Sequence, residues 1–230
     1  MAVLVLGDLG LSPRMQYHAL SLAEERAAVE LIGYRGSELP PELIAHPAVT
    51  VHRLPAPPSL DADRGRWLWL DGGRRLAAQS LLLLRLLLAG LPRPDLLLVQ
   101  NPPPMPALAV AWLAARLRRA RLVVDWHNFG HAMLALKLGR RHPAVRLVAG
   151  HERRWGRRAD GHLTVSRAMS AELKRWGIDA RVLYDRPPQR FRPTPAADRH
   201  RLFRRLAAAL DLPPGIGGSA GDQTATPFTE

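Results

Sequence analysis

Strongly polar side chains follow an apolar run in the segment LVVDWHNFGH, from Leu122 to His131. The run ends at Asp125, and His127 and Asn128 follow within three residues. An unperturbed histidine titrates near neutral pH, so His127 is a candidate general base. Asp125 is either a base itself or the group that orients His127. The alternative for His127 is a structural imidazole that only makes hydrogen bonds.

Two further features of this segment bear on ligand binding. Trp126 has a flat ring on which a sugar or an apolar chain could stack, although core packing is the more usual role of a tryptophan. His127 and His131 are four residues apart and would share one face of a helix. They lack an acidic companion in a recognised metal-binding pattern, so we expect no metal site here.

A second candidate is the loop GDLGLSPR, from Gly7 to Arg14, which leads into a predicted helix. Ser12 is a suitable N-cap, and Pro13 suits the first helical position. The amides of Gly10 to Ser12, with Arg14 nearby, could hold a phosphate group. The loop has neither the G-x-G-x-x-G pattern nor the P-loop lysine, and a simple tight turn is the alternative.

Short apolar runs alternate with helical patterns along the chain. Most runs are continuous, as expected of strands that are covered on both faces. The predicted strands are Ala2–Leu6, Val29–Tyr34, Val49–Leu54, Asp95–Gln100, Arg121–Asp125, Gly161–Ser166 and Ala180–Asp185. After the helix that starts at Pro13, the predicted helices are Gly73–Ala89, Pro106–Arg118, Pro143–Arg158, Arg167–Trp176 and Asp198–Ala209. This order predicts the α/β class with a Rossmann-like parallel sheet.

The polar candidates gather where the predicted strands end. These ends carry Gly7 and Asp8, Gln100 and Asn101, Asp125 to Asn128, Ser166 and Asp185. Parallel strands end at one edge of a sheet, and open parallel sheets bind their ligands beyond that edge. We therefore expect a site on this edge, with Asp8, Asn101, His127 and Asp185 on the same rim.

The composition limits metal chemistry and partners. The chain has 230 residues, no cysteine and a net charge of +13. Without cysteine, no disulfide or thiolate metal site can form. The charge suggests an anionic partner such as a phosphate ester, a membrane surface or nucleic acid, although it also fits the base composition of an arginine-rich gene. The arginines are dispersed and no nucleic-acid-binding motif occurs, so we expect no nucleic-acid partner.

Two apolar stretches also carry basic residues. The run from Leu76 to Leu91 is interrupted by Arg85 and is shorter than the roughly 20 residues of a membrane-spanning helix. The segment FGHAMLALKLGRRHP, from Phe129 to Pro143, combines apolar residues with lysine and arginine. Such segments are typical of helices that lie in a membrane interface, and also of ordinary core helices.

Four long motifs occur in the order found in a known family. They are LGDLGLSPRMQYHALSLA (Leu6–Ala23), LLVQNPPPMPALAVAW (Leu97–Trp112), VVDWHNFGHAMLALKLGRRHP (Val123–Pro143) and VLYDRPPQRFRPT (Val182–Thr194). With these motifs the chain resembles the β-1,4-mannosyltransferases that act on chitobiosyl-diphosphodolichol, over roughly Val3 to Leu206. The resemblance implies the amino-terminal domain of a GT-B glycosyltransferase, which faces the membrane and holds the lipid-linked acceptor.

The resemblance also implies how the chain is organised. Residues 1–195 would form the acceptor-side domain, residues 196–210 a helix that leads toward a second domain, and residues 211–230 a flexible tail. We expect that second domain, which would bind most of the donor GDP-mannose, and the membrane-anchoring helix of the family to be missing. No other cofactor is implied. Half of a site cannot orient both substrates, so we expect little or no transferase activity from this chain alone.

The family reaction inverts the anomeric centre, so one displacement assisted by one base suffices. We expect that base to be His127, then Asp125, then Asp8. The acceptor-binding candidates, among which Arg14 and the nearby amides would take the diphosphate, are Gly10, Ser12, Arg14, Asn101, Trp126 and Asn128. The implied partners are dolichol-diphosphate-linked chitobiose, the cytosolic face of the endoplasmic reticulum membrane and other mannosyltransferases of the pathway. The alternative is a non-catalytic half that binds the membrane or related transferases.

Overall fold

A computed structural model describes residues 1–56, 68–185 and 193–211 of the chain. The chain divides into two compact units, Met1–Asp185 and Arg186–Glu230. Of the second unit, the described part contains one helix, α8 (Ala196–Ala209). The boundary thus lies at Asp185 rather than at residue 195, and the expected tail lies outside the described residues apart from Asp211.

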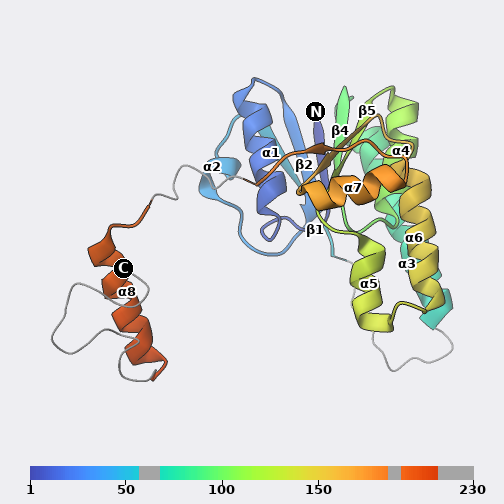
Figure 1. Ribbon diagram of the computed structural model, residues 1–230. Helices are drawn as coiled ribbons and strands as arrows, with labels where there is room; N and C mark the ends of the chain where they lie inside the picture. The colour runs from blue at the N-terminus through green and yellow to red at the C-terminus, as the bar shows by residue number, and fades with distance from the viewer. Residues whose placement is uncertain (57–67, 186–192, 212–230) are drawn as a thin grey trace. The chain divides into compact units, whose positions relative to one another are not determined.

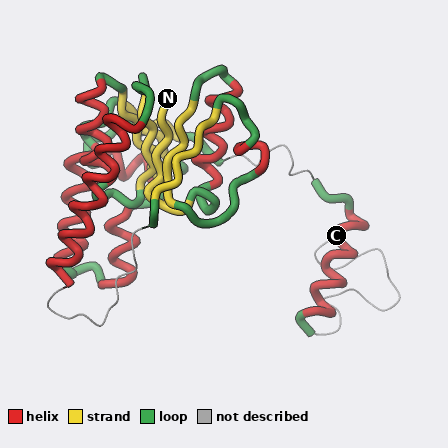
Figure 2. Tube along the Cα trace, turned by 180° about the vertical axis from the view of Figure 1, so that it is seen from behind, coloured by secondary structure: helices red, strands yellow, loops and turns green. Residues whose placement is uncertain are grey.

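Seven parallel strands form a single sheet in the first unit (Figures 1 and 2). In spatial order they are β3 (Val49–Leu54), β2 (Val29–Tyr34), β1 (Ala2–Asp8), β4 (Leu96–Asn101), β5 (Arg121–Trp126), β6 (Gly161–Thr164) and β7 (Arg181–Val182). The predicted α/β class and Rossmann-like parallel sheet are confirmed. All the predicted strands form, although β6 and β7 end earlier than expected.

Helices connect the strands and cover both faces of the sheet (Figure 1). In chain order they are α1 (Pro13–Glu24), α2 (Pro41–Ile44), α3 (Leu68–Arg85), a π-helical turn η2 (Leu86–Gly90), α4 (Ala107–Arg118), α5 (Gly130–Leu138), α6 (Pro143–Gly156) and α7 (Arg167–Arg175). Within the described ranges, every helix is too short or too polar to traverse a bilayer.

The predicted helices all form, and the structure adds α2 and α5. Helix α2 is only a single turn and gave no periodic signal. Helix α5 begins at Gly130, within the segment Phe129–Pro143 whose composition is typical of an interfacial or core helix. Pro13 occupies the first turn of α1 as expected. Ser12 occupies the N-cap position of α1 as predicted, but its side chain does not cap the helix, because its hydroxyl donates to the carbonyl oxygen of Asp8 at 3.0 Å and accepts no bond from the helix amides.

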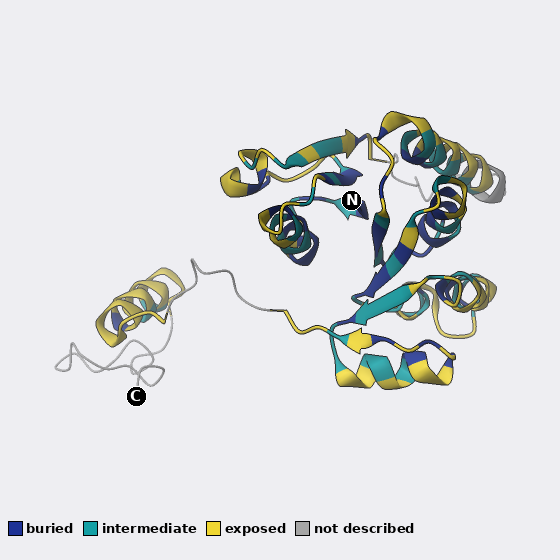
Figure 3. Cartoon of the chain, turned by 90° about the horizontal axis from the view of Figure 1, so that it is seen from above, coloured by how far each residue is buried: buried dark blue, intermediate teal, exposed yellow. Residues whose placement is uncertain are grey.

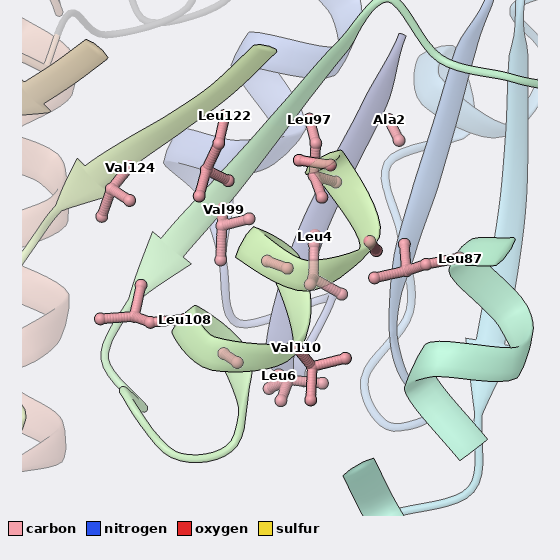
Figure 4. Close-up of a cluster of buried hydrophobic side chains, with 14 of the residues drawn as sticks. Ala2, Leu4, Leu6, Leu87, Leu97, Val99, Leu108, Val110, Leu122 and Val124 are labelled. Carbon is pink, nitrogen blue, oxygen red and sulfur yellow. The ribbon is translucent and has the colours of Figure 1, made fainter. Parts of the chain in front are cut away.

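The central strands β1, β2, β4 and β5 are largely buried on both faces because their alternate residues pack against different helices (Figure 3). On one face, Val3 and Val5 of β1 pack in a cluster with Met15 and Ala19 of α1. On the other face, Leu4 and Val99 pack with residues of η2 and α4 (Figure 4). This two-sided burial explains why the strands are continuous apolar runs in the sequence.

The sheet reverses its order of strand addition at β1, which pairs with both β2 and β4. Strands β2 and β3 follow on one side, and β4 to β7 follow on the other. In doubly wound sheets, the carboxyl ends of the strands at such a switch point line the usual ligand site. Asp8 ends β1, Asn101 ends β4 and Trp126 ends β5, so the topology brings the candidate loops to the same edge.

Candidate functional site

The carboxylate of Asp125 is the centre of the polar cluster at this edge. Its Oδ2 atom accepts hydrogen bonds from Arg14 Nε at 2.8 Å, from His18 Nε2 at 2.8 Å and from His127 Nε2 at 3.1 Å. Its Oδ1 atom accepts from Arg14 Nη2 at 3.1 Å. The side chain of Asp125 is fully buried, whereas those of His18 and His127 are 16% and 18% exposed. The structure thus brings Asp125 and His127 together with Arg14, which the sequence placed in the separate loop before α1.

The environment of Asp125 keeps this carboxylate ionised. Burial by itself raises the pKa of Asp125, but the hydrogen bonds from His127, His18 and Arg14 outweigh burial and hold the pKa far below its usual value. A carboxylate with so low a pKa is a poor proton acceptor near neutral pH. Asp125 is therefore suited to orient His127 rather than to be the base.

The guanidinium of Arg14 is occupied by protein acceptors. Beyond its pair with Asp125, Nη1 donates to the carbonyl oxygen of Leu183 at 2.8 Å and to Asp185 Oδ1 at 2.6 Å. Arg14 is only 7% exposed. The expectation that Arg14 binds a diphosphate directly does not fit this arrangement, because four of its five N–H donors are already paired within the chain. Arg14 instead ties α1 to β5 and to the segment that follows β7.

The loop before α1 is a closed turn rather than an open phosphate cradle. The amide of Gly10 donates to Asp8 Oδ1 at 2.9 Å. The amides of Leu11 and Ser12 donate to the carbonyl oxygens of Asp8 and Leu9, each at 3.2 Å. All three amides have partners, so the expected phosphate binding by Gly10 to Ser12 is wrong for this conformation.

Asp8 stabilises this turn and its neighbour. Its carboxylate accepts the Ser37 amide at 2.9 Å and 3.0 Å and the Ser37 hydroxyl at 2.9 Å. The backbone hydrogen bond from Ser37 is the largest of the effects that lower the pKa of Asp8. A carboxylate engaged in this way is a weak base. Asp8 lies on the expected edge, but its carboxylate is bonded to Gly10 and Ser37 rather than to His127, and these contacts do not support its role as third-choice base.

Trp126 points into the core and not toward a ligand. It is fully buried, and its ring lies beside those of Phe129 and Trp176, with centroid separations of 6.2 Å and 6.0 Å. Its indole Nε1 donates to His162 Nδ1 at 3.2 Å. The expected stacking of a sugar on Trp126 is therefore wrong, and the alternative of core packing holds.

Asn101 belongs to a second buried network, built on Glu152 of α6. Its Nδ2 atom donates to Glu152 Oε1 at 2.9 Å and to the carbonyl oxygen of Asn128 at 3.2 Å. Glu152 also accepts the amides of Gly130 and His131, at 2.7 Å and 3.1 Å, and so holds the first turn of α5. Asn101 is fully buried here, and these contacts assign it to the support of the His127 loop. The residue Asn128 is exposed at the same edge.

The two histidines of the opening segment have separate partners. His127 precedes α5 and bonds to Asp125, whereas His131 lies in the first turn of α5, and its Nδ1 is 2.5 Å from Glu152 Oε2. They do not share a ligand site. In residues 1–56, 68–185 and 193–211, no group of three or more histidine and carboxylate side chains is placed to hold a metal ion.

Sequence reasoning missed His18 and Glu152. His18 follows Arg14 by four residues on α1, so the two share a helix face that points toward the edge. That spacing was a usable signal once α1 was predicted. Glu152 gave no signal, because its buried position depends on how α6 packs beside β4 and α5.

Comparisons with known proteins identify the family of the chain. Residues 10–186 match the model of the glycosyl transferase 4-like domain. The UDP-glycosyltransferase TURAN of Arabidopsis thaliana is 44% identical over 217 residues, which are 93% of this chain and 46% of that protein. The chitobiosyldiphosphodolichol beta-mannosyltransferase of Mus musculus is 38% identical over 90% of this chain and 42% of its own length. The Homo sapiens protein of the same name is 38% identical over 89% and 43%. The chain thus spans less than half the length of these relatives.

Proposed function

Because the chain belongs to the glycosyl transferase 4-like family, we propose that it supplies the acceptor side of a mannosyltransferase. The reaction would move mannose from GDP-mannose to chitobiosyl-diphosphodolichol with inversion to a β-1,4 linkage. The names of the mouse and human relatives support this substrate class. The observation that carries the proposal is the imidazole of His127, held at the sheet edge by a buried, ionised carboxylate.

The proposed step needs one base on this chain. Asp125 is an acceptor only, so it fixes the proton of a neutral His127 on Nε2 and leaves Nδ1 able to accept a proton. His127 Nδ1 would take the proton of the acceptor 4-hydroxyl as that oxygen attacks the anomeric carbon of mannose. The bond from that carbon to GDP breaks with its electron pair, and GDP leaves. The resulting imidazolium is stabilised by Asp125.

Acceptor contacts would come from exposed groups near His127. Asn128 is the candidate that remains at the surface, because Asn101 and Trp126 are buried and Arg14 is engaged. The donor GDP-mannose would be held mainly by a domain that corresponds to the half of the relatives that this chain does not match. Arg14 and Asn101 contribute by fixing Asp125 and the His127 loop.

The α5–α6 hairpin, residues 130–156, is the proposed membrane surface. It extends past the end of the sheet (Figure 1) and contains strongly exposed apolar side chains, with Leu136 at 89% and Leu147 at 64%. From Trp126 to His151 the sequence contains no acidic residue and the cations Lys137, Arg140, Arg141 and Arg146. Apolar side chains among cations suit a bilayer with anionic head groups. Because the named relatives act on a dolichol-linked sugar, the membrane that we propose is the endoplasmic reticulum membrane, at its cytosolic face.

The function is tested by restoring a donor-binding half. The chain is combined with the carboxy-terminal half of the mouse relative in two ways, by co-expression and as a single fused chain. Mannosyl transfer to a short-chain chitobiosyl diphosphate lipid is then measured. We expect transfer from GDP-mannose by the combination and little or none by the chain alone. A combination that folds but transfers nothing would contradict the proposal.

A different nucleotide sugar is the second candidate donor, because TURAN is named a UDP-glycosyltransferase and is 44% identical. The same assay with UDP-sugars separates the two donors. If the chain binds lipid vesicles and the acceptor lipid but no combination transfers any sugar, the non-catalytic alternative is correct.

A further inference from the structure

We propose that His18 is a second functional imidazole of this site. It would act as a positioning residue that shares one carboxylate oxygen with His127 and thereby limits how readily His127 takes up a proton. Only the catalytic role of His18 rests on the proposed function. The protonation of the two imidazoles can be measured without any substrate.

The two imidazoles come from separate elements and meet at one atom. His18 lies in α1, and His127 follows β5. Their Nε2 atoms lie 2.8 Å and 3.1 Å from Asp125 Oδ2. Both rings are largely but not fully enclosed, and the carboxylate between them is fully buried. A fully buried acceptor shared by two largely enclosed imidazoles gives each ring a direct influence on the other.

The carboxylate dictates where the ring protons lie. An ionised carboxylate only accepts hydrogen bonds, so each ring must present an N–H at Nε2. In the neutral rings Nδ1 then carries no proton, which is the tautomer that a base acting through Nδ1 requires. The same atom fixes this tautomer in His18 and in His127.

Three hydrogen-bond donors compete for the shared oxygen of Asp125. A carboxylate oxygen has two lone pairs, but Oδ2 is approached by three donors, the third being Arg14 Nε at 2.8 Å. The bond to His127 is the longest of the three. Without the donor of His18, Oδ2 would bind His127 more strongly and favour its protonated form. The other charged groups bonded in this cluster are Arg14 of α1 and Asp185 after β7, and both are unchanged by replacing His18.

The experiment is NMR spectroscopy of the purified 230-residue chain, without donor or acceptor. In the unchanged chain, the ring nitrogen shifts of His18 and His127 should show protonation of Nε2 in the neutral state. In H18M, which removes the donor, the pH midpoint of His127 should rise by about 0.5–1 unit. In H18Q, whose amide nitrogen takes the place of Nε2, the midpoint should stay near that of the unchanged chain.

Two results would overturn the proposal: a neutral His18 with its proton on Nδ1, or a folded H18M in which the His127 midpoint does not move. If circular dichroism shows that H18M does not fold, the nitrogen shifts of the unchanged chain still decide. A failure of mannosyl transfer with these NMR results intact would count against the proposed function and leave the pairing of His18 with His127 in place.

Discussion

Arg14 and Asp125 form a bidentate ion pair that joins helix α1 to strand β5, with Nε–Oδ2 and Nη2–Oδ1 separations of 2.8 Å and 3.1 Å. Their side chains are 8% and 0% exposed. Removing the guanidinium would leave a buried carboxylate without its main counter-charge. We predict that R14A lowers the free energy of unfolding by about 3–5 kcal/mol, measured by urea denaturation.

The matched control for this prediction is R116A. Arg116 is an exposed arginine near the end of α4, and its loss should change the free energy of unfolding by less than about 0.5 kcal/mol. Equal effects of R14A and R116A would show that the ion pair with Asp125 does not stabilise the fold.

His162 makes the stability depend on pH. Burial lowers the pKa of His162 from 6.5 to about 4, and its Nδ1 accepts the Trp126 indole proton, which requires a neutral ring. Because the folded pKa lies below the unfolded one, the stabilisation is complete above pH 6.5 and is lost as the pH falls toward 4. The loss should reach at most roughly 3 kcal/mol.

Urea denaturation at several pH values between 4 and 6.5 measures the slope of the free energy of unfolding against pH. In H162Q the side chain does not titrate, so the part of the slope that His162 causes should disappear. An unchanged slope in H162Q would mean that other groups cause the acid sensitivity.

Two glycines of α6 give a matched pair of substitutions. A Cβ atom on Gly156 would lie 2.8 Å from the Trp126 ring, whereas one on Gly150 would meet nothing within 4 Å. G156A should destabilise the chain by about 1–3 kcal/mol through overpacking. G150A should stabilise it by about 0.5–1 kcal/mol, because alanine favours a helix more than glycine does. Thermal unfolding of both variants is the measurement, and a stable G156A would contradict the packing of Trp126 against α6.

Leu136 tests the proposed membrane surface. It is 89% exposed on α5, and burying one leucine in a membrane interface is worth about 1.5–3 kcal/mol. L136E should therefore reduce binding to vesicles of phosphatidylcholine and phosphatidylinositol by about tenfold or more, as measured by co-flotation. The control is L117E, because Leu117 is 60% exposed near the end of α4 and lies outside the hairpin. Equal losses in the two variants would contradict the α5–α6 surface.

The fold could be predicted because its central strands appear in the sequence as continuous apolar runs. Residues such as Val3 and Leu4 are both buried, on opposite faces, so the strand reads as one apolar run. The polar residues directly after these runs then had to meet at one edge, which is why Asp125 and His127 were identified.

The partners of each side chain at that edge could not be predicted. Whether Arg14 meets a ligand or Asp125 depends on the approach of α1 to β5, which no local pattern encodes. Trp126 illustrates the same limit, because the sequence left both ligand stacking and core packing open, and the packing of Gly156 and Trp176 against it made it core. The amides of Gly10 to Ser12 were satisfied by turn geometry that depends on Asp8.

The most direct test of the account is the kinetics of H127A in the fusion with a carboxy-terminal mannosyltransferase half. If His127 takes the proton of the acceptor hydroxyl, kcat should fall by roughly 10²–10⁴-fold while the Kd for GDP-mannose stays nearly unchanged. A near-normal kcat in H127A would contradict the account, because another group would then be the base.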